Sequence, residues 1–245
     1  MSSDPFPGLP RRHFAAVLAD PPWHFRARSI DNRSQWRSRR DAEKFYNVLG
    51  IDDIVALPVQ TLAAPDAHLF LWATGPCLPH AFRVIEAWGF RYSGIAFTWI
   101  KTKRKILAGT PVNESGLHVG LGFTTRKNAE FCLLARRGNA RRIAKDVREV
   151  ILSPVREHSR KPDEARARIE RYCAGPYLEL FARDRRPGWE AWGDQVDHFS
   201  VDLPYDEQVD ALESYNDGVR EVGRRVKAGA PLPDMFIPSR EWEAT

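Results

Sequence analysis

The chain of 245 residues carries 37 Lys and Arg side chains against 32 Asp and Glu, a formal net charge of +5, and is long enough for one large domain with its own core. It has no run of about 20 apolar residues for a membrane helix, no apolar signal region at its N-terminus, and no cysteine spacing typical of disulfides or metal ligands. These features exclude membrane-spanning and disulfide-rich secreted proteins, and they predict a soluble, cytoplasmic protein without a metal.

Short apolar segments alternate with stretches of helical periodicity, which predicts an α/β fold with helices covering both faces of a sheet. In chain order, strands are expected over 14–19, 68–73, 92–100, 129–135, 147–152 and 177–182, and helices over 52–62, 78–88 and 162–172. The last helix has the clearest start, with Ser159 or His158 as its cap and Pro162 in its first turn. Its N-terminus is therefore a predicted site for an anion or a carboxylate.

Two segments lack apolar periodicity and are predicted loops. Residues 24–44 contain six arginines, and residues 101–128 combine basic side chains with four glycines. The charge also changes along the chain, because residues 1–196 hold 32 basic and 21 acidic side chains (+11), whereas residues 197–245 hold 5 and 11 (−6). We therefore predict a main domain over 1–196 and an acidic appendage over 197–245, helical near 205–227 and then rich in proline.

The first predicted strand runs directly into Asp20-Pro21-Pro22-Trp23. Ligands sit at the carboxyl ends of strands in α/β sheets, and two prolines stiffen such a turn. The exocyclic amine of a nucleobase is a poor nucleophile, and a carboxylate with a rigid carbonyl can accept both of its N–H bonds while an aromatic ring stacks on the base. Asp20, the Pro21 carbonyl and Trp23 match these roles. The alternative is a plain turn that caps a helix.

The wider pattern resembles the MT-A70-like family, adenine N6-methyltransferases related to the catalytic subunit of the messenger-RNA N6-adenosine methyltransferase, and above all its bacterial and phage members. The matching motifs are Ala-Asp-Pro-Pro-Trp at 19–23, Leu-Phe-Leu-Trp-Ala-Thr at 69–74, Ala-Trp-Gly-Phe at 87–90, Trp-Ile-Lys-Thr at 99–102, Thr-Arg-Lys-Asn-Ala-Glu-Phe at 125–131, Arg-Glu-His-Ser-Arg-Lys-Pro-Asp-Glu at 156–164, Glu-Leu-Phe-Ala-Arg at 179–183 and Gly-Asp-Gln at 193–195. Each motif is short, but their common order and spacing are specific.

This resemblance implies a Rossmann-like methyltransferase sheet with a permuted (beta-class) motif order and S-adenosylmethionine as methyl donor. By position, Lys161 matches the lysine that reaches the cofactor carboxylate, and Arg183 matches the arginine near the ribose. Asp194 and Gln195 match the polar pair on the ribose and adenine side, and His158 and Ser159 adjoin the lysine. Asp194 departs from the Asn of the animal enzymes. The alternatives are a solvated Lys161, an Arg183 that only forms a salt bridge, and a simple turn at 194–195.

On the substrate side, two basic clusters follow the catalytic turn and a central strand. We predict phosphate contacts from Arg26 and Arg28 in the first cluster and from Lys101 and Lys103 in the second. Trp36 and Tyr46 are the predicted aromatic contacts, and Tyr46 matches the family's tyrosine near the acceptor. The alternative for both clusters is a solvated face.

The predicted activity is direct, in-line methyl transfer to the N6 amine of adenine in DNA, in which orientation supplies much of the rate and no metal takes part. RNA is the alternative substrate. A catalytically inactive paralogue that binds nucleic acid is the alternative class, although Asp20 through Trp23 are all intact.

Overall fold

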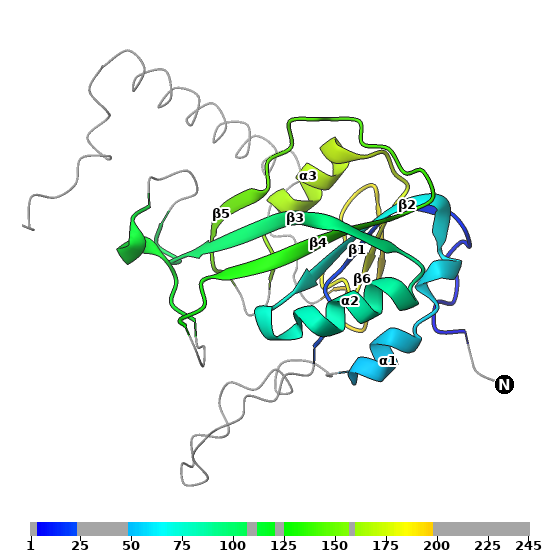
Figure 1. Ribbon diagram of the computed structural model, residues 1–245, viewed down its shortest axis with the longest axis horizontal. Coiled ribbons are helices and arrows are strands. Elements are labelled where there is room, and N and C mark those ends of the chain that lie inside the picture. Colours follow the sequence, from blue (N-terminus) through cyan, green and yellow to red (C-terminus); the bar gives the residue numbers. More distant parts are fainter. Residues whose placement is uncertain (1–3, 24–48, 107–111, 121–124, 157–159, 198–245) are drawn as a thin grey trace, which may run out of the picture. The chain divides into compact units, whose positions relative to one another are not determined.

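The computed structural model describes residues 4–23, 49–106, 112–120, 125–156 and 160–197 (Figure 1). Seven strands form one mixed sheet in the order β5-β3-β4-β2-β1-β6-β7. The strands are β1 (Phe14–Ala19), β2 (Ala63–Ala73), β3 (Arg91–Thr102), β4 (Ala129–Arg137), β5 (Val150–Pro154), β6 (Tyr177–Leu180) and β7 (Trp189–Trp192). The α-helices are α1 (Ile51–Ala56), α2 (Leu78–Ala87) and α3 (Glu164–Tyr172). The predicted α/β fold is confirmed.

The sheet is built around β1. This strand pairs in parallel with β2 on one side and with β6 on the other, and β7 extends the parallel part beyond β6. The pairing of β2 with β4 is antiparallel. The carboxyl ends of β1, β2, β6 and β7 therefore meet at one edge of the sheet, which is where α/β proteins place their ligands.

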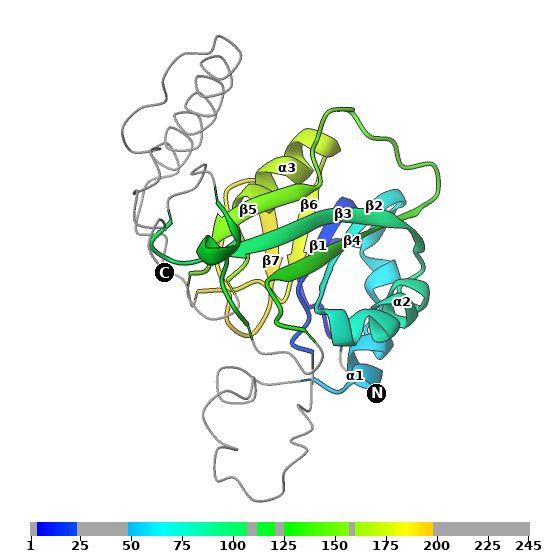
Figure 2. The ribbon, with the colours of Figure 1, turned by 60° about the vertical axis from the view of Figure 1, so that its left-hand side comes forward.

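Alternation along the strands divides the core into two layers. Val17, Leu69 and Leu71 belong to a cluster with the buried residues of α1 and α2. On the other face, the Tyr172 ring of α3 packs edge-on against His68 and Phe70, with centroids 5.2 and 5.9 Å apart. Figures 1 and 2 show α3 on the opposite side of the sheet from α1 and α2. Helices on both faces, as predicted, bury the sheet from two sides.

The predicted helix over 52–62 is wrong in its second half. α1 ends at Ala56, Leu57 is extended, and a 3-10 helix, η2 (Val59–Thr61), follows Pro58. A proline disfavours the helical conformation of the residue before it and cannot donate to the helix ladder, so Pro58 divides the segment. Trp88 at the end of α2 fastens α1 by donating its indole N–H to the Ile54 carbonyl, at 2.9 Å.

Other boundaries differ from the prediction by a few residues. β5 spans 150–154 rather than 147–152, and β2 begins five residues earlier than expected. β6 ends at Leu180 because Phe181 has a φ of +61°, which breaks the strand. α3 begins at Glu164 with Asp163 at its N-cap, so the expected cap at Ser159 or His158 is wrong. The sequence prediction also missed β7, a strand of four residues.

The chain divides into two compact units. The first comprises Met1–Trp99, Ala129–Ile151 and His158–Ser200, and the second comprises Ile100–Asn128, Leu152–Glu157 and Val201–Thr245. In the second unit, the His118 N–H donates to the Lys101 carbonyl at 2.8 Å, and the Val155 N–H donates to the Thr102 carbonyl at 3.0 Å. The division into domains 1–196 and 197–245 stays a prediction. No helix within the described ranges is long and apolar enough to cross a membrane.

Candidate active site

Strand register brings the first site residues together. Ala19, the last residue of β1, pairs with Leu71 of β2 and with Leu180 of β6, while Trp72 pairs with Cys132 of β4. Asp20 therefore follows β1 at the level of Trp72. Because successive side chains alternate between faces, Asp20 lies on the same face as Leu18, which is the face that α3 covers.

The Asp20 to Trp23 turn is held by two hydrogen bonds. The Trp23 backbone N–H donates to the Pro21 carbonyl at 2.7 Å, and its indole N–H donates to the Trp72 carbonyl at 2.9 Å. Trp23 is buried, with 8% of its surface exposed. A carbonyl oxygen has two lone pairs, so the Pro21 oxygen retains the capacity to accept a bond from a ligand.

Lys161 connects the turn to the strand on the far side of β2. Its Nζ lies 2.6 Å from Asp20 Oδ2, 3.4 Å from Glu130 Oε2 and 5.7 Å from the centroid of the Trp72 ring. The Lys161 and Asp20 side chains are 17% and 24% exposed. An ammonium group carries three N–H donors, so one side chain can serve both carboxylates and an anionic ligand. The predicted cofactor lysine and the predicted catalytic carboxylate thus form one pair.

Opposing influences act on the Asp20 carboxyl. Burial is the largest and raises its pKa above 3.8, whereas the charge and hydrogen bond of Lys161 lower it. Glu130 adds a smaller raising effect, and the positive charge of Arg183 a smaller lowering effect. The net result is a raised pKa, because desolvation of the carboxylate outweighs its cationic neighbours.

A buried network of ion pairs connects α3 with β6 next to the site. Arg166 of α3 donates from Nε to Glu179 Oε2 at 2.7 Å and from Nη1 to Asp184 Oδ2 at 3.1 Å. The three side chains are 11%, 14% and 8% exposed. Burial works against the charged guanidinium, but Glu179 and Asp184 together raise the pKa of Arg166. The network ties the first turn of α3, just after Lys161, to β6 and to the segment that carries Arg183.

The segment after β7 is packed against the segment after β6. The Ala182 N–H donates to the Trp192 carbonyl at 3.0 Å. A Cβ on Gly193 would lie 2.7 Å from the Ala182 oxygen and 2.9 Å from its nitrogen, so only glycine fits there. This close approach brings Asp194 and Gln195 beside the segment that contains Arg183.

The structure thus gathers eight predicted residues at the carboxyl edge of the sheet, all within the first unit: Asp20, Pro21, Pro22, Trp23, Lys161, Arg183, Asp194 and Gln195. The roles of the other predicted residues stay predictions. Lys101 and Lys103 belong to the second unit. Six further predicted residues lie outside the described ranges: Arg26, Arg28, Trp36, Tyr46, His158 and Ser159.

Sequence reasoning missed Glu130 and Arg166. Glu130 lies within a motif that was used only for the resemblance, and nothing in its spacing reveals a contact with Lys161. The position of Arg166 could have been noticed in the sequence. It shares a helix face with Ile169 and Cys173, at the spacing i, i+3, i+7, and all three side chains are buried. An arginine on the apolar face of a helix requires carboxylate partners.

The residues present fit S-adenosylmethionine. Its amino-acid end carries an ammonium and a carboxylate, and the site offers Lys161 between the carboxylates of Asp20 and Glu130. The indole Nε1 of Trp72 is buried beneath Lys161 and has no hydrogen-bond acceptor among the described residues. Within the described part of the chain, no group of three His, Cys, Asp or Glu side chains could hold a metal ion.

Comparison with known proteins places this site in context. A family model described as MT-A70 matches residues 14–195, from the start of β1 to the end of the Gly193 to Gln195 motif. The chain is 28% identical over 218 residues to the Type II methyltransferase M.MunI of a Mycoplasma species, covering 84% of this chain and 87% of that protein.

Longer eukaryotic proteins are similar as well. The N(6)-adenosine-methyltransferase MT-A70-like of Arabidopsis thaliana is 29% identical over 232 residues, which cover 92% of this chain and 28% of the plant protein. The human N(6)-adenosine-methyltransferase catalytic subunit METTL3 is 29% identical over 213 residues, which cover 84% of this chain and 32% of the human protein. This chain thus corresponds to about a third of these eukaryotic relatives.

Proposed function

The chain belongs to the MT-A70 family of adenine N6-methyltransferases, and from this premise we propose that it methylates the N6 amine of adenine in DNA. The observation that carries the proposal is the partly buried Asp20 carboxylate at the end of β1, beside the Pro21 carbonyl and 2.6 Å from Lys161. An amine nitrogen becomes nucleophilic when both of its N–H bonds are accepted. Asp20 and the Pro21 oxygen are the acceptors in this proposal.

Each residue of the turn has a defined task. Asp20 accepts one N–H bond of the amine and takes up its proton, or passes it to water, as the new N–CH₃ bond forms. The Pro21 carbonyl accepts the second N–H bond, from a position that Pro22 and the 2.7 Å bond from Trp23 hold rigid. Trp23 supplies an aromatic surface for the base, and its indole bond to the Trp72 carbonyl prevents rotation of the ring.

Bound S-adenosylmethionine supplies the methyl group as a sulfonium, and the bond between sulfur and methyl breaks as the N–CH₃ bond forms. We propose that Lys161 holds the carboxylate of the cofactor. Arg183, Asp194 and Gln195, which the Gly193 contact brings beside each other, would hold the ribose and adenine side. A carboxylate such as Asp194 accepts from ribose hydroxyls, as acidic residues do in dinucleotide folds.

The comparison with M.MunI, which covers most of both proteins, favours DNA as the substrate. M.MunI matches this chain over most of both proteins and is a Type II methyltransferase. The N(6)-adenosine-methyltransferase names of the eukaryotic relatives favour the N6 position of adenine and make RNA the second candidate. We propose that Arg26, Arg28, Lys101 and Lys103 contact phosphates, and that Trp36 and Tyr46 contact bases. A cytoplasmic location agrees with the three free thiols at Cys77, Cys132 and Cys173.

A labelled methyl-transfer assay tests the proposal. The full chain is incubated with labelled S-adenosylmethionine and, in parallel, with double-stranded DNA, single-stranded DNA and RNA that contain adenine. We expect label in N6-methyladenine of DNA. Transfer to RNA alone would replace the substrate, and cofactor binding with no transfer to any polymer would favour the inactive paralogue.

The Asp20→Ala variant tests the residue that carries the proposal. We expect transfer to be abolished while cofactor binding, followed by calorimetry, persists. Asp52→Ala is the matched control, because the Asp52 side chain is 85% exposed on α1 and, among the described residues, pairs with the surface residue Arg83. Normal transfer by Asp20→Ala would remove Asp20 from the reaction.

A further inference from the structure

A second group of basic side chains lies on the segment that joins β4 to β5. We name it the edge cluster, and it consists of Arg136, Arg141, Arg142, Lys145 and Arg148, all exposed. None of the five forms an ion pair with a carboxylate of the described residues. The proposed catalytic machinery uses none of them, so the cluster calls for a separate explanation.

The edge cluster and the candidate active site lie at opposite edges of the sheet. β4 runs antiparallel to β2, so Glu130 is near Lys161 while Arg136 pairs with His68, at the start of the apolar part of β2. Arg136 follows Glu130 by six positions along β4, which at about 3.3 Å per position corresponds to about 20 Å. The cluster is therefore too far away to contact an adenine held at Asp20.

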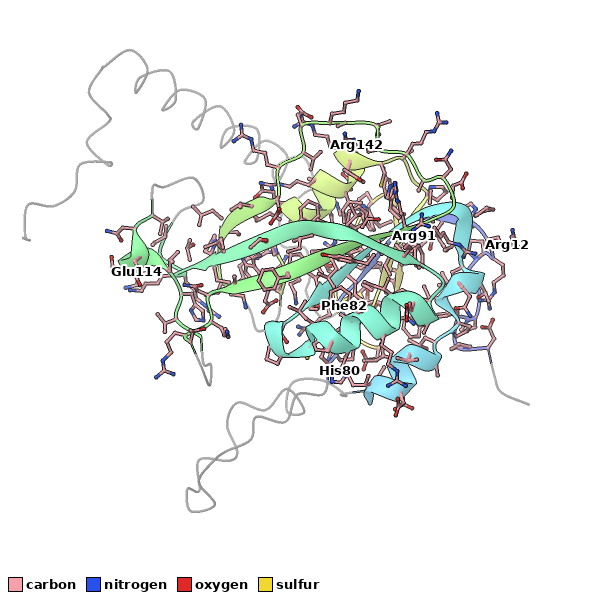
Figure 3. The ribbon with its side chains drawn as sticks, viewed as in Figure 1. Arg12, His80, Phe82, Arg91, Glu114 and Arg142 are labelled. Atoms are coloured by element: carbon pink, nitrogen blue, oxygen red, sulfur yellow. The ribbon has the colours of Figure 1, made fainter. Side chains whose placement is uncertain are left out.

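The segment is fastened to the protein at three points. The Asn139 N–H donates to Asp66 Oδ1 at 2.7 Å, and the Ile143 N–H donates to the Tyr172 carbonyl at 2.8 Å. Arg168 of α3 donates to the Val150 carbonyl at 2.9 Å. A segment held in this way presents its cations without a large loss of entropy on binding. Figure 3 shows Arg142 beside α3, on the side of the sheet opposite to His80 and Phe82 of α2.

The acidic side chains nearby are occupied by other partners. Asp146 pairs with Arg171, Glu149 accepts from the Thr98 hydroxyl at 2.7 Å, and Asp66 accepts from Asn139. Residues 136–150 carry six basic and two acidic side chains, so the local charge is positive. Burial is the main cause that lowers the pKa of His68 to about 4, and the charge of Arg136 adds to it.

We propose that the edge cluster binds the phosphate backbone of the nucleic-acid substrate, about 20 Å from the target adenine. The proposal rests on the proposed function, since it assumes that the substrate is a polymer. Guanidinium and ammonium groups pair with phosphates irrespective of base sequence, and one strand offers a phosphate about every 3.4 Å. The cluster would then contact nucleotides about six positions away from the target base, and it would add affinity without taking part in methyl transfer.

The experiment measures the affinity of the full chain for a fluorescent 30-base-pair duplex across a series of salt concentrations. For Arg141→Gln/Arg142→Gln we expect binding about tenfold weaker near 0.1 M salt, and a slope of log K against log salt reduced by about two. Single-turnover transfer at saturating duplex should be unchanged. Arg83→Gln is the control for charge, because it removes one exposed guanidinium from α2 that is already paired with Asp52.

A short duplex of about eight base pairs centred on the adenine supplies the second arm. It cannot span 20 Å on either side, so the double variant and the parent should bind it equally. Equal affinity and equal salt slope for the long duplex would overturn the proposal, and so would an equal loss for both lengths. Binding is measured separately from transfer. A protein that transfers no methyl group would contradict the proposed function, whereas the binding data would still test the edge cluster.

Discussion

The Lys161 ammonium has two tasks that compete for the same charge. It lies 2.6 Å from Asp20 and 3.4 Å from Glu130, and in the proposed function it also holds the cofactor carboxylate. Asp20 must be ionised to accept an N–H bond from adenine, yet burial raises its pKa. Lys161 counteracts that burial, whereas Glu130 reinforces it. In the proposed function, cofactor binding and protonation of Asp20 therefore both depend on the charge of Lys161.

This coupling predicts opposite pH responses in two variants. Activity should fall on the acid side as Asp20 becomes protonated. Glu130→Gln removes a negative charge that raises the Asp20 pKa, so the acid limb should move to lower pH. Lys161→Gln removes the charge that lowers this pKa, so the acid limb should move to higher pH.

The measurement is the single-turnover transfer rate against pH, with cofactor and DNA both saturating, so that weaker cofactor binding does not distort the profile. Asp52→Asn, a surface change on α1, should leave the profile in place. Shifts of both site variants in the same direction would show that the acid limb belongs to another group.

Among the secondary-structure elements, α3 connects the separate segments of the candidate site. Arg166 connects its first turn to Glu179 of β6 and to Asp184, with all three side chains largely buried. A buried ion pair contributes little when compared with apolar residues, but removal of one partner leaves an uncompensated charge. Removal of the Arg166 side chain therefore destabilises the fold through the carboxylates that it leaves unpaired, and a change in helical propensity matters less.

We expect Arg166→Met to lower the free energy of unfolding by about 3–5 kcal/mol at neutral pH, because Glu179 and Asp184 lose their cation. The deficit should shrink toward pH 4, since burial already raises the pKa of Glu179 and protonation removes its charge. Arg171→Met is the control, because the Arg171 and Asp146 side chains are 61% and 67% exposed and their pair contributes about 0–1 kcal/mol. Urea unfolding of the two variants at both pH values tests this, and equal losses would contradict it.

The elements differ in how far the sequence could predict them. The strand positions followed from apolar periodicity, which burial on both faces of a sheet imposes. The break at Pro58 could be predicted from the proline itself, whereas the end of β6 depends on the positive φ of Phe181, which no local rule predicts. β7 has only four residues and pairs with β6 alone, so its stability comes from tertiary packing.

The residues of the candidate site also differ in how far the sequence could predict them. Asp20 was predicted from its place directly after the first strand, and Lys161 and Arg183 from the resemblance. The parallel register of β1 and β6 explains why Asp20 and the segment that carries Arg183 reach the same edge of the sheet. The contacts that Lys161 makes with Asp20 and Glu130 join residues from separate strands and loops, so they depend on the folded sheet. Periodicity carries no information about such contacts, although a buried Arg166 could have been inferred from the face of α3.

For the whole molecule, the net charge of +5 combines two parts of opposite sign. Residues 1–196 carry +11 and residues 197–245 carry −6. The acidic part opposes binding of a nucleic acid to the basic part wherever the two parts lie within the screening length, which is about 10 Å at 0.1 M salt.

Deletion of residues 203–245 should therefore tighten DNA binding at low salt and steepen its salt dependence, while the two proteins should converge at high salt. Titrations at several salt concentrations test this prediction, and a thermal unfolding curve confirms that the shortened chain is folded. Unchanged affinity and unchanged salt dependence would leave this segment with a structural or solubility role only.

The pairing of Asp20 with Lys161 joins two residues that are 141 positions apart in the chain. β1 is made early, but its neighbour β6 and the lysine come from the last third of residues 1–196. During synthesis, the Asp20 turn exists for most of the elongation time without Lys161, without Arg166 and without the strands β6 and β7. In the proposed function, residues 161–195 hold the methyl donor, so we expect a ribosome-bound intermediate to bind it only after this segment has emerged and β6 and β7 have joined the sheet.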